Sequence, residues 1–148
     1  QIKIYLVALV WAWVTVVLPV VFGELAYSWS LVLLFLERTL FVFAITLPFD
    51  IRDVNVDDHT DVSTIPAVIG VERSKQLALI LLMSAFLFSI INWYLGFYST
   101  SLITGLAVSF ISTGVLVNFS SINRHDYFYS GLVDGTMILH GVLVFLLL

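Results

Sequence analysis

Long apolar runs separated by short polar connections make up most of the chain. Five runs are evident, at about residues 4–22, 31–49, 76–96, 101–118 and 131–148. Each run is continuous and has about 18–21 residues, close to the roughly 20 that a helix needs to cross the hydrocarbon core of a bilayer. Membrane barrels instead use short strands in which apolar and polar residues alternate. The pattern therefore predicts an all-α integral membrane protein with five transmembrane helices.

The composition agrees with a membrane location. Of the 148 residues, 61% are hydrophobic and only 11% are charged, and the mean hydropathy of +1.09 is far above that of soluble domains. The absence of cysteine excludes disulfides and thiolate metal sites. The sequence also lacks the basic stripe that binds nucleic acid, so membrane lipid is the expected surrounding partner.

Basic residues are distributed unevenly between the connections. Pro48 is expected to end the second span, which makes residues 50–75 a loop on the same side as the N-terminus and the connection at 119–130. That side carries Lys3, Arg52, Arg73, Lys75 and Arg124, and the opposite connections carry no basic residue. Because positive charge concentrates on the cytoplasmic side of membrane proteins, we expect a cytoplasmic 50–75 loop and a bacterial inner (plasma) membrane location.

The expected loop begins with five aspartates in twelve positions. On a helical continuation of the second span, Asp50, Asp53, Asp57 and Asp61 would project within an arc of about 80°. Poor helix formers follow Asp53, so regular helix is expected to weaken there. Mg²⁺ prefers oxygen ligands and often bridges one or two carboxylates to substrate phosphates. A Mg²⁺ site for a phosphate- or diphosphate-bearing substrate and a merely solvated acidic loop are equal alternatives on these grounds.

The stretch DIRDVNVDDHTDVSTIPAVIG, residues 50–70, resembles the second aspartate-rich motif of the UbiA-type intramembrane prenyltransferase superfamily. In that motif DxxDxxxD precedes a K-[ST]-x-P-x-x-x-G-like tail. The matching positions are Asp50, Asp53 and Asp57 in the acidic part and Thr64, Pro66 and Gly70 in the tail. Two spans before the motif and three after it match helices five to nine of a nine-helix bundle. The chain is thus expected to be the C-terminal half of a longer protein.

The resemblance implies Mg²⁺-dependent transfer of an isoprenyl group from an isoprenyl diphosphate to a lipophilic acceptor of quinone, pigment or lipid biosynthesis. Asp53 and Asp57 would be the catalytic residues, and Asp50 and Asp61 would complete the metal site. Mg²⁺ on these carboxylates would neutralise charge on the diphosphate as the allylic C–O bond breaks. Further substrate contacts are expected from three residues on the motif side, Arg52, Arg124 and Asp134.

Two departures from the family pattern leave another interpretation open. Ser63 replaces the family's lysine before the tail, and the first aspartate-rich motif, N-x-x-x-D-x-x-x-D, has no counterpart. The other acids are scattered, at Glu24, Glu37, Glu72, Asp126 and Asp134. The chain can therefore supply only half of a two-motif site. The alternative is a non-catalytic prenyltransferase-like subunit that packs with other membrane subunits of a larger complex, and a transporter half with an acidic vestibule is a weaker third interpretation.

Several polar residues have ordinary structural interpretations. Arg124 is equally a cytoplasmic anchor, and Asp134 is equally an acid favoured by the dipole at a helix N-terminus. Glu37 and Arg38 lie inside the second span, where charges are costly. Since adjacent residues point about 100° apart on a helix, these two are expected to find partners on other helices. His140 is expected to be a hydrogen-bonded core histidine.

Small residues and aromatic residues are also patterned. The fourth span carries a stripe of small side chains, expected to permit close helix packing: Gly105, Ser109, Ser112 and Thr113. Aromatic residues gather on the motif side, where they are expected to form an interfacial belt: Phe49, Tyr127, Phe128 and Tyr129.

Overall fold

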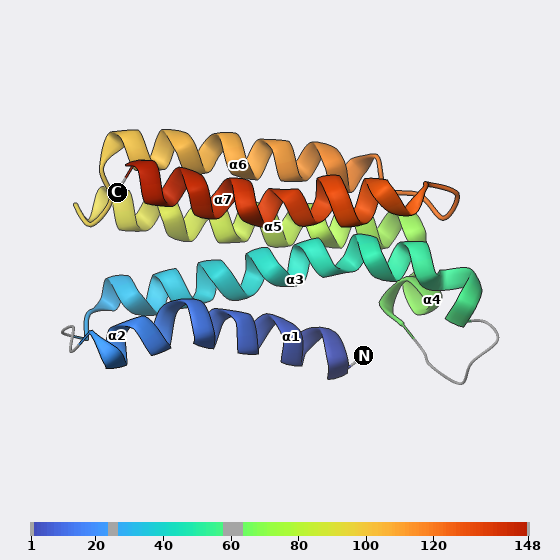
Figure 1. Ribbon diagram of the computed structural model, residues 1–148, viewed down its shortest axis with the longest axis horizontal. Helices are drawn as coiled ribbons and strands as arrows, with labels where there is room; N and C mark the ends of the chain where they lie inside the picture. The colour runs from blue at the N-terminus through green and yellow to red at the C-terminus, as the bar shows by residue number, and fades with distance from the viewer. Residues whose placement is uncertain (1, 24–26, 58–63, 148) are drawn as a thin grey trace.

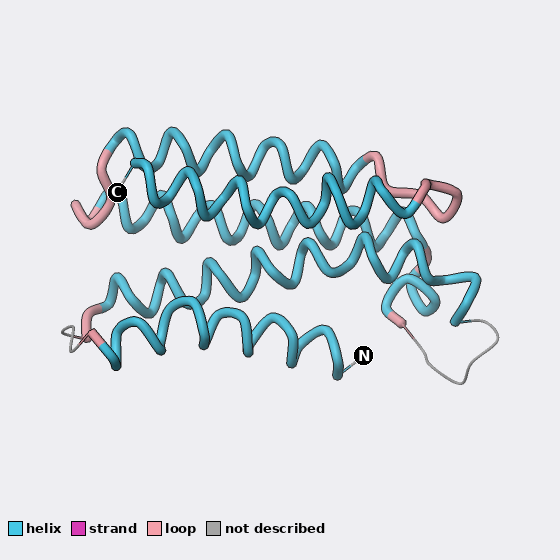
Figure 2. The backbone as a smooth tube through the Cα atoms, in the orientation of Figure 1, coloured by secondary structure: helices cyan, strands magenta, loops and turns pink. Residues whose placement is uncertain are grey.

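The computed structural model describes residues 2–23, 27–57 and 64–147, without the side chains of residues 55–57. Over these ranges the chain contains helices and connections but no strand (Figures 1 and 2). Five helical stretches are long and apolar enough to cross a membrane: Ile2–Phe22, Trp29–Val54, Val71–Tyr94, Thr100–Asn118 and Phe128–Leu147. The predicted all-α architecture and the predicted number of membrane-length helices are confirmed.

The first of these stretches is composite. Helix α1 (Ile2–Ala12) continues through a π-helical segment, η1 (Trp13–Val17), into the short helix α2 (Leu18–Phe22). Pro19 lies in the first turn of α2. Proline has no backbone N–H to donate to the preceding turn, and a widened turn is one way in which a helix accommodates that loss.

The second stretch corrects the sequence prediction. Helix α3 (Trp29–Asp57) contains Pro48 and continues nine residues beyond it, so the expected end of the span at Pro48 is wrong. The expected 50–75 loop is also wrong over its described parts, since α3 is followed by helix α4 (Ile65–Ile69) and by α5 (Val71–Tyr94). Leu47 and Ile51, on either side of Pro48, are both 0% exposed. Their burial against neighbouring helices outweighs the local preference of proline and of the residues after it.

The tail of the aspartate motif has a clear backbone role. Thr64 precedes α4 in extended conformation, Pro66 lies in its first turn, and Gly70 ends it with φ +86°. Proline suits a first helical turn, where an N–H has no partner in the helix, and a positive φ favours glycine. The Gly70 carbonyl then accepts a hydrogen bond from Ser74 Oγ at 2.9 Å. This part of the motif reverses the chain between α3 and α5.

Helix α3 lies at the centre of the bundle. It packs against α1 on one side and α5 on the other, while α5 packs on α6 (Thr100–Asn118) and α6 on α7 (Asp134–Leu147). A π-helical segment, η2 (Phe128–Val133), precedes α7 and contacts both α3 and α6. In Figure 1, α1 and α2 form one edge of the bundle, and the end of α3 that carries the motif extends past the start of α1.

The stripe of small residues on α6 was predicted to permit close helix packing, and the helix it packs against is α7. A Cβ atom added to Gly105 would meet the side chain of Leu147. Ser109 and Thr113, further along the same stripe, are both 0% exposed. Close approach of α6 and α7 explains why small residues occupy these positions.

Candidate functional site

The predicted carboxylates lie on the end of α3 that extends past α1. Because α3 is one helix through Asp57, Asp50, Asp53 and Asp57 are brought within an arc of about 60°. Asp61 and the side chain of Asp57 lie outside the described residues, as do Asp58, His59 and Ser63. Within the described part of the chain, no three His, Cys, Asp or Glu side chains converge to hold a metal ion. Asp50 and Asp53 nevertheless fit the one or two protein carboxylates that Mg²⁺ uses beside substrate phosphates.

Arg52 forms the centre of a charged cluster at this end of the bundle. Its Nε donates to Asp53 Oδ1 at 2.7 Å and its Nη2 donates to Asp53 Oδ2 at 3.2 Å. Its Nη1 lies 3.7 Å from Oδ1 of Asp126, whose side chain is 80% exposed. The fork-like contact with Asp53 fixes the guanidinium, whereas the exposed pair with Asp126 contributes little energy. The guanidinium therefore lies directly beside a motif carboxylate.

Aromatic rings form a platform for this guanidinium. The Arg52 Cζ atom lies 5.5 Å from the ring centroid of Phe49 and 5.6 Å from that of Tyr129. Tyr129 is 0% exposed, and its hydroxyl donates to the Ser121 carbonyl at 2.6 Å and accepts from the Ser121 N–H at 3.0 Å. Cation–π contact with a ring held in this way orients the planar guanidinium, whose paired N–H donors suit the oxygens of a phosphate group.

The other two predicted substrate contacts lie apart from this cluster. Arg124 is exposed, its Nε donates to the Phe119 carbonyl at 3.2 Å, and its Cζ lies 5.2 Å from the ring centroid of Phe128. Asp134 begins α7, is exposed, and lines an open cavity between the first helical stretch, α3 and α7. Arg52 is close enough to Asp134 to act on it electrostatically. The structure thus places Asp134 within electrostatic reach of Arg52 and places Arg124 in the connection between α6 and η2.

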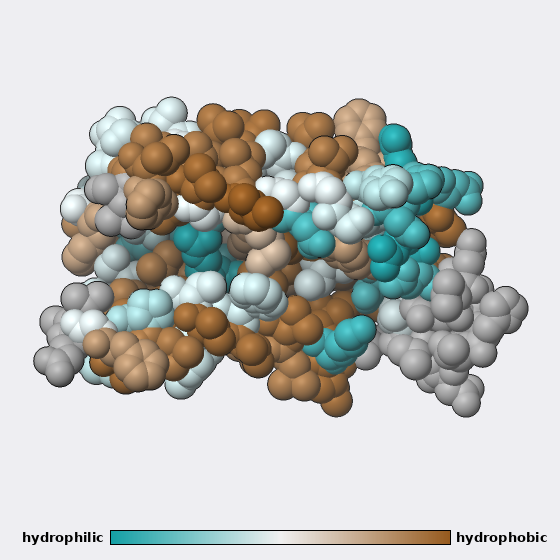
Figure 3. Space-filling view, viewed as in Figure 1, coloured by the Kyte–Doolittle hydropathy of each residue, from teal (hydrophilic) through white to brown (hydrophobic). Residues whose placement is uncertain are grey.

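A cavity of about 590 Å³ lies between the first helical stretch, α3 and α7. Most of its lining is apolar, and Asp134 and Arg38 are the charged residues in it. A second cavity, of about 230 Å³, shares Thr15 and Arg38 with the first and extends to Glu37 and Tyr98. In Figure 3, hydrophilic side chains show along the line between two mostly hydrophobic layers. The two cavities are therefore neighbours with polar groups along mostly apolar walls, and together they are called the polar crevice.

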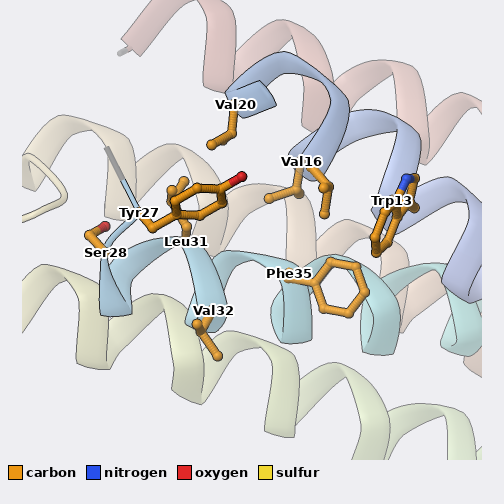
Figure 4. Close-up of a pocket in the computed structure, with 9 residues that line it drawn as sticks. Trp13, Val16, Val20, Tyr27, Ser28, Leu31, Val32 and Phe35 are labelled. Carbon is orange, nitrogen blue, oxygen red and sulfur yellow. The ribbon is translucent and has the colours of Figure 1, made fainter. Parts of the chain in front are cut away.

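A third cavity, of about 260 Å³, lies at the opposite end of the bundle from the aspartates. Figure 4 shows its wall, to which Trp13 and Val16 contribute from η1, Val20 from α2, and Leu31 and Phe35 from α3. Val16 also lines the 230 Å³ cavity. The almost wholly apolar lining is suited to a hydrocarbon chain and offers no reactive group.

A buried polar cluster lies deep in the bundle. Glu37 is 1% and His140 0% exposed. Nδ1 of His140 is 3.0 Å from Ser109 Oγ, its Nε2 is 3.8 Å from Glu37 Oε1, and the Tyr98 hydroxyl donates to Glu37 Oε2 at 3.3 Å. Burial and the nearby Glu37 carboxylate raise the pKa of Tyr98 well above its usual value, so Tyr98 remains a hydrogen-bond donor. The predicted partners of Glu37 on other elements and the predicted core role of His140 are confirmed.

The residues near the motif form two groups. Arg52, Asp53 and Asp126 make the charged cluster at the helix end, and the polar crevice lies deeper between the helices. Sequence reasoning missed the pairing of Asp126 with Arg52, and no spacing in the sequence indicated it. Comparison of the chain with protein-family models, with curated proteins and with solved structures found no match.

Proposed function

We propose that this protein takes part in the Mg²⁺-dependent transfer of an isoprenyl group from an isoprenyl diphosphate to a lipophilic acceptor inside the membrane. In this proposal the chain corresponds to helices five to nine of a UbiA-type bundle and supplies the second aspartate-rich motif. The observation that carries the proposal is the unbroken course of α3 through Pro48. It brings Asp50, Asp53 and Asp57 onto one helical face at the end of an apolar bundle.

The charged cluster supplies the binding chemistry of the proposal. Asp53 and Asp57 act as the catalytic metal ligands, with Asp50 and Asp61 completing the set. Bound Mg²⁺ would neutralise the diphosphate as it leaves. Arg52, already held beside Asp53 at 2.7 Å, offers N–H donors to the same diphosphate.

The interior of the bundle supplies the space for the substrate's tail. Asp134 lines the 590 Å³ cavity and lies within electrostatic reach of Arg52. A diphosphate bound at the charged cluster can therefore extend its chain into that cavity. The apolar walls suit an isoprenyl chain, and Asp134 borders its path. Arg124, in the connection between α6 and η2, is available to diphosphate oxygens on the same side of the bundle. We place this side in the cytoplasm and the protein in the bacterial inner membrane.

A second candidate is a non-catalytic prenyltransferase-like subunit of a larger membrane complex. It is favoured by the absence of a convergent group of three metal ligands within the ranges 2–23, 27–57 and 64–147. It is also favoured by the missing first aspartate-rich motif. In that case the charged cluster would contact a neighbouring membrane subunit.

The test uses the complete gene product that contains this sequence, purified in detergent and supplied with radiolabelled isoprenyl diphosphates and a membrane lipid extract. We expect Mg²⁺-dependent labelling of a lipophilic product. Asp53→Asn and Asp57→Asn should each lower it by at least about 100-fold, because they remove charge stabilisation in the transition state. The matched control is Glu72→Gln, which changes an exposed carboxylate on α5 that pairs with Lys75 at 3.0 Å. Labelling that both aspartate variants retain would exclude the assignment of the site.

A further inference from the structure

We propose that Arg38 sets the maximum length of the isoprenyl chain, by placing a charge at the inner end of the 590 Å³ cavity. This inference rests on the proposed function, since it concerns the tail of the same diphosphate substrate. Arg38 would then determine which substrates are accepted, and it would take no part in the reaction at the diphosphate.

Arg38 lies on the same face of α3 as the motif. At about 100° per residue, Asp53, Phe49, Val42 and Arg38 fall within an arc of about 60°. Fifteen positions separate Asp53 from Arg38, which at about 1.5 Å per residue is about 22 Å along the helix axis. A chain that starts at a diphosphate beside Asp53 and follows α3 therefore reaches Arg38 after about 22 Å.

Arg38 places a charge in an otherwise mostly apolar wall. On the motif side of it, the cavity is lined by apolar groups that include Val42 on α3 and Met137 and Ile138 on α7. Arg38 lines both this cavity and the 230 Å³ cavity, so it lies where the two meet. Beyond it the wall carries Glu37 and Tyr98. Between Asp134 and Arg38 the described lining thus carries no other charged group, whereas Arg38 and Glu37 follow each other at its far end.

The charge of Arg38 makes passage of an apolar chain unfavourable. Among the described residues, its guanidinium forms no hydrogen bond and no ion pair within 4.0 Å. A cation inside a span depends on water or polar partners for its solvation. A hydrocarbon chain that moved past Arg38 would displace that water without replacing its hydrogen bonds. Chains that end before Arg38 avoid this cost, and longer ones incur it.

The experiment measures kcat/KM of the complete gene product for all-trans isoprenyl diphosphates from geranyl to decaprenyl. The wild type should show a sharp cut-off at the chain whose extended length is about 22 Å, the distance along α3 from Asp53 to Arg38. Arg38→Met, which keeps an unbranched chain but removes the charge, should raise the ratio of long-chain to short-chain kcat/KM by at least about tenfold. Arg38→Lys keeps the charge and should keep the wild-type profile.

Arg73→Met is the matched control, because Arg73 is an exposed arginine on α5 that lines neither cavity. This variant should leave the profile unchanged. A wild-type profile without a cut-off, or equal profiles for Arg38→Met and Arg38→Lys, would overturn the inference while prenyl transfer itself stands. Loss of transfer at every chain length in folded, monodisperse Arg38→Met would also overturn it. Absence of Mg²⁺-dependent transfer by the wild type at every length would overturn the proposed function, and this inference with it.

Discussion

The hydrogen bond between Ser109 on α6 and His140 on α7 leads to a quantitative prediction about stability. Ser109 Oγ lies 3.0 Å from His140 Nδ1, and both residues are 0% exposed. In Ser109→Ala the ring nitrogen loses its partner, and water has no access to replace it. His140 Nε2 has no hydrogen-bond partner within the described part of the chain, so the imidazole would depend on the Glu37 oxygen 3.8 Å away.

The size of the loss follows from two known ranges. A buried polar atom left without a hydrogen bond costs about 1–3 kcal/mol. Interhelical hydrogen bonds in membrane proteins contribute less, on average about 0.6 and at most about 1.7 kcal/mol, since unfolded helices in the membrane also find partners. Complete burial of the pair favours the upper part of the second range. We therefore expect Ser109→Ala to lower the free energy of unfolding by about 1–2 kcal/mol.

Ser112→Ala is the matched control on the same helix. Ser112 Oγ donates to the Ser109 carbonyl within α6, at 2.8 Å, and among the described residues it makes no hydrogen bond to another helix. Its loss should change the free energy of unfolding by no more than about 0.5 kcal/mol. The assay is reversible unfolding in SDS mixed micelles, followed by circular dichroism. A double-mutant cycle of Ser109→Ala with His140→Phe should give a coupling energy of about 1 kcal/mol. Equal losses for the two serine variants, or a coupling energy near zero, would refute this account of the α6–α7 interface.

Three further predictions can be checked by the same unfolding assay. Gly70→Ala should lower the free energy of unfolding by about 1–3 kcal/mol because alanine is strained at φ +86°. In contrast, Gly114→Ala, whose added Cβ would lie an ordinary 3.5 Å from its neighbour, should not destabilise the fold. Tyr129→Phe keeps the ring beneath Arg52 but loses two hydrogen bonds, so it should lower the free energy of unfolding by about 1–2 kcal/mol. An unchanged free energy of unfolding would show that those bonds contribute nothing. Asp126→Asn should lower the free energy of unfolding by less than about 0.5 kcal/mol, because the carboxylate is 80% exposed. A larger decrease would mean that its pair with Arg52 is stronger than the geometry indicates.

The sequence was sufficient to predict the membrane helices, because continuous apolar runs of this length have few other stable conformations. It failed at Pro48 and over residues 50–57 and 64–75, where the prediction relied on local preferences. Leu47 and Ile51, each 0% exposed, show that packing on neighbouring helices maintains α3 through the proline. This burial depends on helices that are distant in the sequence, so it cannot be predicted from a local sequence pattern.

The polar residues show the same limit. A glutamate within a span indicated that Glu37 needs a partner, and the depth of His140 indicated a core position. The identity of the partners could not be predicted, because Tyr98 lies 61 residues from Glu37 in the sequence and Ser109 lies 31 from His140. The spacing predicted a shared helical face for Asp50, Asp53, Asp57 and Asp61, and the course of α3 agrees with it as far as Asp57. The pairing of Arg52 with Asp126 depends on how the turn after α6 folds back, which spacing does not encode.

The central claim is that the carboxylates of α3 hold a divalent cation together with an isoprenyl diphosphate. Its most direct test is a titration of the complete gene product with Mn²⁺, a paramagnetic substitute for Mg²⁺, followed by electron paramagnetic resonance with and without a farnesyl thiodiphosphate analogue. Reciprocal coupling requires each ligand to tighten the binding of the other. We predict that the analogue tightens Mn²⁺ binding at least about tenfold, and that Asp53→Asn removes this coupling while Glu72→Gln retains it. Mn²⁺ binding that is indifferent to the analogue, or coupling that survives in Asp53→Asn, would contradict the account.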